Sequence, residues 1–190
     1  MRRRLFLALP ALLPPSVARA QDDALTRLMR ALSEVRERRS RFTEEKSIPE
    51  LDLPLPNEGT LLWIAPDRLE KHTRWPIDER LEVSGGRLVY ERADRNLRRE
   101  FALSEQPEMQ ALVEAIRGTL AGDIGTLRRH YEVAFDGSPD GIWRLVLTPL
   151  SLRVRGAVQR ITVTGEGAEL RGVDTEGSNG SSRMRITPAP

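Results

Sequence analysis

The chain has no cysteine among its 190 residues. Disulfide bonds and thiolate metal ligands are therefore excluded, and so is a lipid anchor attached to cysteine. Histidine occurs only at His72 and His130, and neither has a second ligand at the spacing of a known metal motif. The sequence also contains no Walker loop and no G-x-S-x-G elbow. These absences predict a protein that is not an enzyme and has no metal, cofactor or catalytic residues.

Long hydrophobic runs are absent as well, apart from one at the N-terminus. There, three arginines precede a short apolar stretch, and Ala18 and Ala20 form a small-x-small cleavage site. This is the composition of a secretory signal peptide, and the stretch is too short to span a bilayer. We therefore expect residues 1–20 to be removed after Ala20. Residues 21–190 are then expected to form a single exported domain that does not span the membrane.

The positive net charge of the chain resides in this predicted signal peptide. The full chain has 30 basic and 28 acidic residues, and four of the arginines but none of the acids lie within residues 1–20. The remaining chain has 26 basic residues and a net charge of −2 in place of +2. Nucleic-acid binding needs a clustered positive surface, so no nucleic-acid partner is expected.

Proline and glycine divide residues 58–90 into four short, half-apolar segments. The last two segments flank the turn 84–86, which has the composition of a tight β-hairpin. A repeat of about eight to twelve residues between such segments is typical of strands joined by short turns. The region therefore predicts an antiparallel meander.

Two segments instead have helical periodicity. Apolar residues recur every three or four positions in residues 22–38 and 107–120, which predicts two amphipathic helices. The second has Pro107 at its start and Gly122 just beyond its end, as preferred at helix termini. A helical turn is expected at residues 123–129. The apolar face of the first helix either seals the edge of a sheet or covers a cavity, and the sequence leaves both open.

The rest of the chain predicts strands and one unusual connection. Strands are expected over residues 40–48 and 97–103, and repeatedly from residue 130 to the end. Between the strand at residues 40–48 and the meander that begins at residue 58, residues 49–57 contain three prolines, which predict an extended connector or a hairpin tip. Three leucines alternate along this segment: Leu51, Leu53 and Leu55. They either contact a partner or a membrane, or fold back over the sheet.

Several of these features occur together in one known family. They are a glycine-led strand with an apolar-Trp pair, a Pro-Asp corner and a second proline ten residues later, carried here by Gly59, Trp63, Pro66, Asp67 and Pro76. In addition, residues 41–45 are similar to the family's Phe-Thr-Gln strand start, and the turn 84–86 stands where the family has Asp-Gly. In these features the chain resembles LolA, the periplasmic carrier of lipoproteins in Gram-negative bacteria.

The resemblance implies an α+β fold, namely an incomplete antiparallel β-barrel (half-barrel) covered by two or three helices. It also implies a monomeric periplasmic carrier that binds the acyl chains of a lipoprotein or other lipid in an apolar cavity. Such a carrier moves its cargo from an inner-membrane donor protein to an outer-membrane acceptor protein. Ten residues are expected to line the cavity: Leu28, Leu32, Phe42, Trp63, Leu69, Leu81, Leu88, Tyr90, Leu112 and Ile116.

The chain also departs from the family pattern. LolA proteins commonly carry an arginine directly before the first proline, where this chain has Ala65. They carry an aromatic residue in the following strand, where this chain has Lys71 or nearby charged residues. The family arginine is tied to locking of the lid and to handoff. We therefore expect a LolA-related protein with a different lipid cargo rather than the housekeeping carrier.

Two other functions remain open on the sequence. A lipid-sensing regulator of the RseB type would use a similar domain to signal to a protein partner. A periplasmic hydrolase would use acids such as Glu44 or Asp136 in a polar cleft. Adjacent Glu44 and Glu45, however, point to opposite faces of a strand and cannot share one reaction centre. The sequence also leaves open whether the aliphatic strand faces pack into a solid core or line a hollow.

Overall fold

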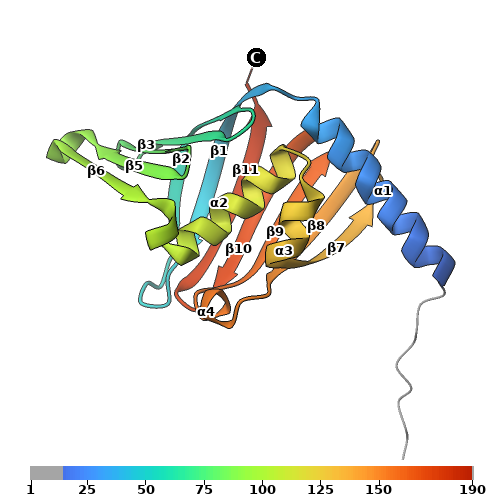
Figure 1. Cartoon of the computed structure of the whole chain (residues 1–190). Helices are drawn as coiled ribbons and strands as arrows, with labels where there is room; N and C mark the ends of the chain where they lie inside the picture. The colour runs from blue at the N-terminus through green and yellow to red at the C-terminus, as the bar shows by residue number, and fades with distance from the viewer. Residues whose placement is uncertain (1–14, 190) are drawn as a thin grey trace, which may run out of the picture.

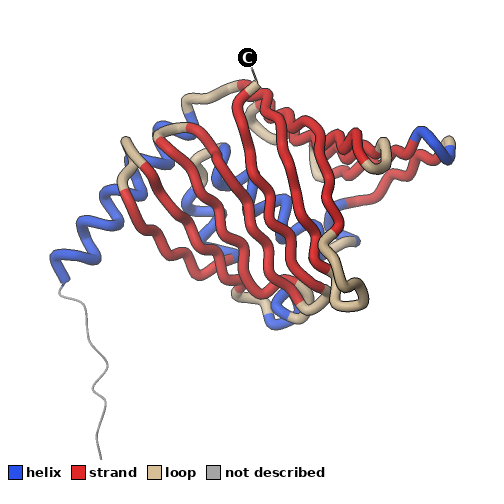
Figure 2. The backbone as a smooth tube through the Cα atoms, turned by 180° about the vertical axis from the view of Figure 1, so that it is seen from behind, coloured by secondary structure: helices blue, strands red, loops and turns tan. Residues whose placement is uncertain are grey.

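Eleven antiparallel strands form one sheet in the computed structural model of the protein, which describes residues 15–189. Their order across the sheet is β6-β5-β4-β3-β2-β1-β11-β10-β9-β8-β7, so β6 and β7 are its two ends. The helices lie against one face of the curved sheet (Figure 1), and strands form the face seen from behind (Figure 2). The predicted α+β half-barrel with covering helices is confirmed.

The elements follow one another with short connections. In chain order they are α1 (Pro15–Ser33), β1 (Glu37–Ser47), β2 (Leu55–Ile64), β3 (Arg68–Trp75), β4 (Glu79–Ser84), β5 (Arg87–Arg92), the 3₁₀ turn η1 (Ala93–Arg95), β6 (Leu97–Ala102), η2 (Leu103–Glu105), α2 (Pro107–Leu120), α3 (Ile124–His130), β7 (Tyr131–Gly137), β8 (Ile142–Pro149), α4 (Leu152–Arg155), β9 (Val158–Glu166), β10 (Glu169–Gly177) and β11 (Gly180–Pro188).

The predicted meander is present as β2 to β5, in which each strand pairs with the next. The turn between β4 and β5 contains Gly85 and Gly86, with φ of +56° and +77°. Two consecutive positive φ angles give the tight turn whose twist matches that of paired strands, and glycine adopts them without a steric penalty. The predicted second helix coincides with α2, and the predicted helical turn with α3.

The first helix was predicted too far along the chain. We expected it over residues 22–38, but α1 ends at Ser33 and β1 begins at Glu37. Four apolar residues of the predicted stripe are buried against the sheet: Leu25, Leu28, Met29 and Leu32. Beyond them the chain alternates between exposed and covered residues, and pairing with β2 and β11 extends this segment into a strand. Tertiary pairing here overrides helix propensity.

Residues 1–14 of the predicted signal peptide lie outside the described residues, and residues 15–20 form the beginning of α1. Removal of the segment after Ala20 therefore stays a prediction. Among the helices of the described chain, none combines the length and the hydropathy that a membrane span requires.

The main core lies where α1, α2 and α3 cover β7 to β11. Its centre is made of fully buried aliphatic side chains from both layers: Leu28, Leu127, Leu145, Leu147, Ile161 and Val163. Trp143 packs in the same core, directly over Gly165, where a Cβ would stand only 2.1 Å from the indole ring. A second, smaller cluster joins α2 to β4 and β5 through Val83, Leu88, Leu103 and Val113.

The hairpin tip between β1 and β2 projects its leucines outward. Leu51, Leu53 and Leu55 are all exposed, Leu53 to 77%. The possibility that they fold back over the sheet is therefore wrong for this structure. Their alternative role as a partner or membrane contact stays a prediction.

Candidate functional site

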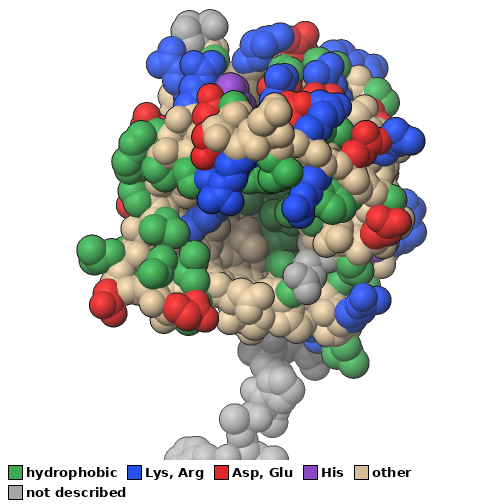
Figure 3. Space-filling view, turned by 90° about the vertical axis from the view of Figure 1, so that its left-hand side faces the viewer, with side chains coloured by type: hydrophobic (Ala, Val, Ile, Leu, Met, Phe, Trp, Pro, Cys, Tyr) green, Lys and Arg blue, Asp and Glu red, His purple; other side chains and the backbone are tan. Residues whose placement is uncertain are grey.

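A cavity of about 370 Å³ lies between α2 and the curved sheet. Its volume falls within the range of roughly 300–1,000 Å³ that is typical of small-molecule sites. Figure 3 shows the hollow on the side of the molecule at the left of Figure 1, with hydrophobic side chains inside it and Lys or Arg side chains at its rim. The question that the sequence left open, solid core or hollow, is answered differently in different parts of the sheet.

Three groups of elements build the walls of the cavity. The helix α2 forms the roof, β2 to β5 form one wall, and β10 and β11 form the other. The apolar lining residues are Leu61, Leu62, Trp63, Leu69, Leu81, Val83, Leu88, Met109, Leu112, Val113, Ile116, Leu120, Leu170, Val173, Met184 and Ile186. The walls are thus largely aliphatic, with Trp63 as an aromatic member.

Six of the ten predicted lining residues border the cavity. They are Trp63, Leu69, Leu81, Leu88, Leu112 and Ile116. Each strand from β2 to β5 contributes one of them, and the two on α2 are four residues apart, as the helical period requires. Trp63 is fixed by its indole N–H, which donates to the carbonyl of Val35 at 3.3 Å. Whether these residues bind a lipid stays a prediction.

The other four predicted residues do not line it. Leu28 and Leu32 on α1 are buried in the packed core instead, because α1 covers the far half of the sheet. Phe42 packs over Gly59 of the adjacent strand, where a Cβ would stand 2.9 Å from the ring. Tyr90 lies opposite Leu81 across β4 and β5, but its hydroxyl donates to Glu79 at 3.1 Å and it does not border the cavity.

The floor of the cavity is polar, which the sequence analysis missed. Four alternate positions of β1 contribute polar side chains to the lining: Arg38, Ser40, Glu44 and Lys46. Phe42 interrupts this row. The signal was present in the sequence as an alternation with period two, but charged residues at alternate positions are normally assigned to the solvated face of a strand. Here the outward face carries Arg39, Arg41 and Glu45, so both faces of β1 are charged.

The most connected group of this floor is centred on Glu44. Lys71 of β3 places its Nζ 2.5 Å from Glu44 Oε2, and Ser182 of β11 donates to Glu44 Oε1 at 2.6 Å. Lys46 Nζ lies 3.7 Å from the same Oε2. The ammonium group of Lys71 also lies 4.8 Å from the centre of the Phe42 ring, within range of a cation–π contact.

Burial and charge act in opposite directions on this group. Burial alone would raise the pKa of Glu44, but Lys71, Ser182 and Lys46 together lower it below its ordinary value. For Lys71, burial is the larger effect and lowers the pKa, although the Glu44 carboxylate opposes it. Glu44 therefore remains a carboxylate at neutral pH, held by two lysines from different strands.

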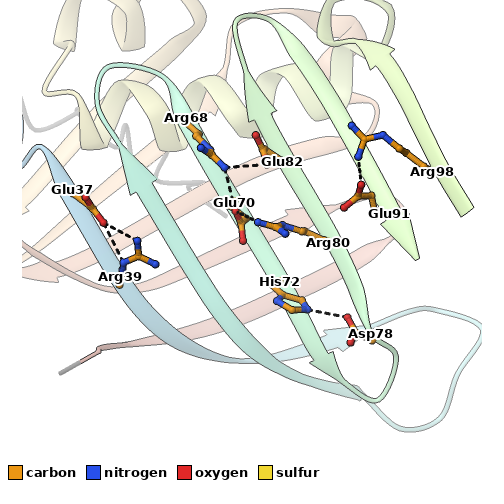
Figure 4. A network of polar contacts seen from close by, with 10 residues as sticks. All are labelled: Glu37, Arg39, Arg68, Glu70, His72, Asp78, Arg80, Glu82, Glu91 and Arg98. Carbon is orange, nitrogen blue, oxygen red and sulfur yellow. Dashed lines mark hydrogen bonds and ion pairs between the residues drawn. The ribbon is translucent and has the colours of Figure 1, made fainter. Parts of the chain in front are cut away.

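The opposite face of β3 to β6 is covered by ion pairs, as Figure 4 shows. Arg80 lies 2.6 Å from Glu70, and Arg68 lies 3.3 Å from Glu82. On the same face, His72 Nε2 lies 2.9 Å from Asp78, in line with a hydrogen-bonded rather than catalytic histidine. Such pairs contribute little stability at a surface. They do keep this face in water and leave the aliphatic face to turn inward.

The acids considered for a hydrolase do not converge. Glu44 is buried in the cavity floor on β1, whereas Asp136 is exposed on β7 at the far end of the sheet. Glu45 points away from Glu44, as expected for neighbours on a strand. Within residues 15–189, no cluster of three or more metal-ligating side chains is found.

Comparison with known proteins gives one family. A family model described as outer membrane lipoprotein carrier protein LolA-like matches residues 15–187. No curated protein matches the chain.

Several solved structures resemble the fold only distantly. A LolA superfamily protein from Nitrosomonas europaea is 11% identical with a TM-score of 0.46, and the alignment covers 88% of this chain and 91% of that chain. A putative outer membrane lipoprotein-sorting protein domain from Vibrio parahaemolyticus is 9% identical with a TM-score of 0.43, covering 88% and 91%. The lipoprotein LppX from Mycobacterium tuberculosis is 12% identical with a TM-score of 0.38, covering 87% and 94%.

Proposed function

The chain belongs to the family of LolA-like outer membrane lipoprotein carrier proteins, and from this premise we propose that it carries an acyl chain in the cavity beneath α2. The cargo is a lipoprotein or another lipid. The protein acts in the periplasm as a monomer without enzymatic activity, and residues 1–20 serve as its export signal. The observation that supports a carrier most directly is the aliphatic cavity of about 370 Å³.

The free energy of acyl burial suits a carrier. Burying hydrocarbon recovers roughly 0.8 kcal/mol per CH₂, so a fourteen-carbon chain gains on the order of 10 kcal/mol relative to water. A bilayer offers a similar gain, so transfer between membrane and cavity is nearly balanced. The protein would therefore allow a lipid to cross water but would not set the direction. Direction would come from an inner-membrane donor and an outer-membrane acceptor.

The six predicted residues that border the cavity are proposed to contact the acyl chain. They come from β2 to β5 and from α2, so a bound chain would lie between the roof and one wall. Leucine and isoleucine side chains offer no fixed hydrogen-bonding groups, and such a surface accepts chains of differing length. Selectivity for the cargo would have to come from the polar part of the cavity.

Filling the cavity tests the proposal. Protein purified from native periplasm should contain lipid that mass spectrometry of the intact complex and of its extract can identify, and it should bind a fluorescent fatty-acid probe. Leu112→Trp places a larger side chain at the roof and is expected to weaken probe binding at least tenfold, since the volume available to the chain falls.

Leu152→Trp is the matched control, because Leu152 is exposed on α4 and does not border the cavity. It should bind the probe as the parent protein does. Absence of lipid from the native protein, together with no probe binding by the parent protein, would refute the carrier. Capture of an inner-membrane signalling protein, in place of a donor and an acceptor, would instead identify a lipid-sensing regulator.

A further inference from the structure

The two lysines of the chain are placed together. Of the 30 basic residues, 28 are arginine, and the two lysines are Lys46 and Lys71. They are far apart in sequence and lie on different strands, yet both border the cavity and both lie near the same oxygen of Glu44. Arginine occupies the other basic positions, and of these Arg38 also borders the cavity, where it is engaged by the carbonyl of Ala168 and by Glu169.

Lysine and arginine differ in what they can bind. The arginine guanidinium is a planar fork, whereas the lysine ammonium is a compact charge with three donors on a flexible stem. Two ammonium groups that border one cavity can approach a single oxyanion from different sides. Charge-assisted hydrogen bonds to carboxylate or phosphate are stronger than hydrogen bonds between neutral groups.

The group carries a surplus positive charge. Glu44 is largely buried, with 6% of its side chain exposed, and it is matched by Lys71 at 2.5 Å. Among the described residues, the ion pair found for Lys46 is the longer one of 3.7 Å to the same carboxylate. Two ammonium groups and one carboxylate leave a net charge of +1. The Lys46 side chain is 39% exposed and that of Lys71 21%, so a ligand in the cavity can reach both.

The surroundings of these lysines separate a polar from an apolar part of the cavity. Lys46 and Ser182 lie directly opposite each other on β1 and β11, next to Glu44. Further along β1 the opposing residues become Ile186 and then Leu61. An elongated ligand would thus meet the two lysines at one end and mainly aliphatic walls beyond them, where Ser40 and the paired Arg38 are the polar residues of the floor. This is the arrangement that an amphiphile requires.

We propose that Lys46 and Lys71, positioned by Glu44 and Ser182, form a head-group subsite, and that the cargo is an anionic amphiphile. Its acidic group, a phosphate or a carboxylate, binds between the two ammonium groups, and its hydrocarbon chain lies against the aliphatic walls. This inference rests on the proposed carrier function and specifies the class of lipid carried. Burial of Lys71 lowers its pKa, and a bound anion would oppose that effect.

The scarcity of lysine makes the subsite directly observable. Reductive methylation with ¹³C-formaldehyde labels primary amines and keeps their charge, so the labelled groups are Lys46, Lys71 and the chain N-terminus. Dodecyl phosphate is expected to shift the two lysine signals in NMR spectra. Dodecanol has the same hydrocarbon chain without the charge and should bind about tenfold more weakly by calorimetry.

Variants on the two faces of β1 give matched controls. Lys46→Met removes one charge from the cavity floor, and it should fold because Lys46 is partly exposed and only loosely paired. It is expected to lose most of the tenfold preference for dodecyl phosphate. Arg41→Met removes one charge from the outward face of the same strand and should keep the preference.

The possible outcomes are distinct. Inorganic phosphate alone should leave the lysine signals unmoved at concentrations where dodecyl phosphate saturates them. If it shifts them equally, the site is one for free phosphate and the inference is wrong. If dodecanol binds as tightly as dodecyl phosphate and Lys46→Met changes nothing, the inference fails while the carrier stands. If neither alkyl compound binds, the carrier itself fails.

Discussion

The two halves of the sheet use the same alternation of inward and outward residues with different results. Under α1 and α3, the inward residues of β8 and β9 are fully buried and form a solid core. Under α2, the inward residues of β3 and β4 include Leu69 and Leu81, which are only half-buried and face the cavity. A helix over a sheet therefore does not by itself produce a filled interior.

The difference lies in the strand beneath the helix. The inward residues of β8 are Trp143, Leu145 and Leu147, and a helix that packs on them gains hydrophobic burial. The inward face of β1 is mainly polar, and its Glu44 pairs with Lys71 of β3. Packing α2 onto this floor would remove the remaining water from charged groups, which costs free energy. We infer that the polar floor helps to keep the cavity open.

The largest expected effect compares one substitution in both halves. Leu145→Ala in the solid core should lower the free energy of unfolding by about 2–5 kcal/mol, because it leaves a new void among fixed neighbours. Leu81→Ala only enlarges an existing hollow, and we expect a loss of about 1 kcal/mol. Denaturant unfolding with each variant measures both values.

Acyl-probe binding should respond in the opposite order. Leu81→Ala removes part of one cavity wall and should weaken binding of the acyl probe. Leu145→Ala should bind the probe normally while it remains folded. Equal losses of stability in the two variants would show that the half of the sheet under α2 is packed as tightly as the half under α1 and α3.

The features that the sequence revealed are those with a clear period and clear boundaries. The meander was predictable because glycine and proline mark its turns, and α2 because Pro107 and Gly122 mark its ends. The α1–β1 boundary was not predictable, since Arg36 and its charged neighbours suit a helix terminus and an exposed strand equally well. Only the pairing of β1 with β2 and β11 decides between them.

The candidate site was predictable in its apolar part alone. The inward residues Trp63 and Leu69 follow from strand alternation, and Leu112 and Ile116 from the helical repeat. Leu28 was assigned to the cavity wrongly, because periodicity shows which face of a helix is buried but not which half of the sheet it covers. Lys71 was read only as a departure from the family pattern, since its partner Glu44 is distant in the sequence.

A smaller effect tests the Glu44 group. Glu44→Gln leaves Lys71 without its carboxylate, and breaking a fully buried ion pair typically costs about 3–5 kcal/mol. Lys71 keeps 21% of its side chain exposed, so water can compensate in part and we expect a loss of roughly 2 kcal/mol. The double variant Glu44→Gln/Lys71→Met should recover most of it, because no unpaired charge remains. Chemical denaturation of both variants measures the coupling, and a double variant no more stable than Glu44→Gln would contradict the pairing.

The smallest expected effect is the dependence of stability on pH in acid. The pKa of Glu44 is lower in the folded protein than its ordinary value of 4.5, because Lys71, Ser182 and Lys46 outweigh the effect of burial. Its contribution to stability is therefore complete above pH 4.5 and is lost as the pH falls through the lower folded pKa. The parent protein should lose stability over this range more steeply than Glu44→Gln/Lys71→Met, in which the group cannot titrate. Unfolding curves at successive pH values measure the two slopes. Identical slopes would mean that Glu44 is not held as a carboxylate in the folded protein. Without that charge, the polar floor would oppose the packing of α2 onto β1 less strongly.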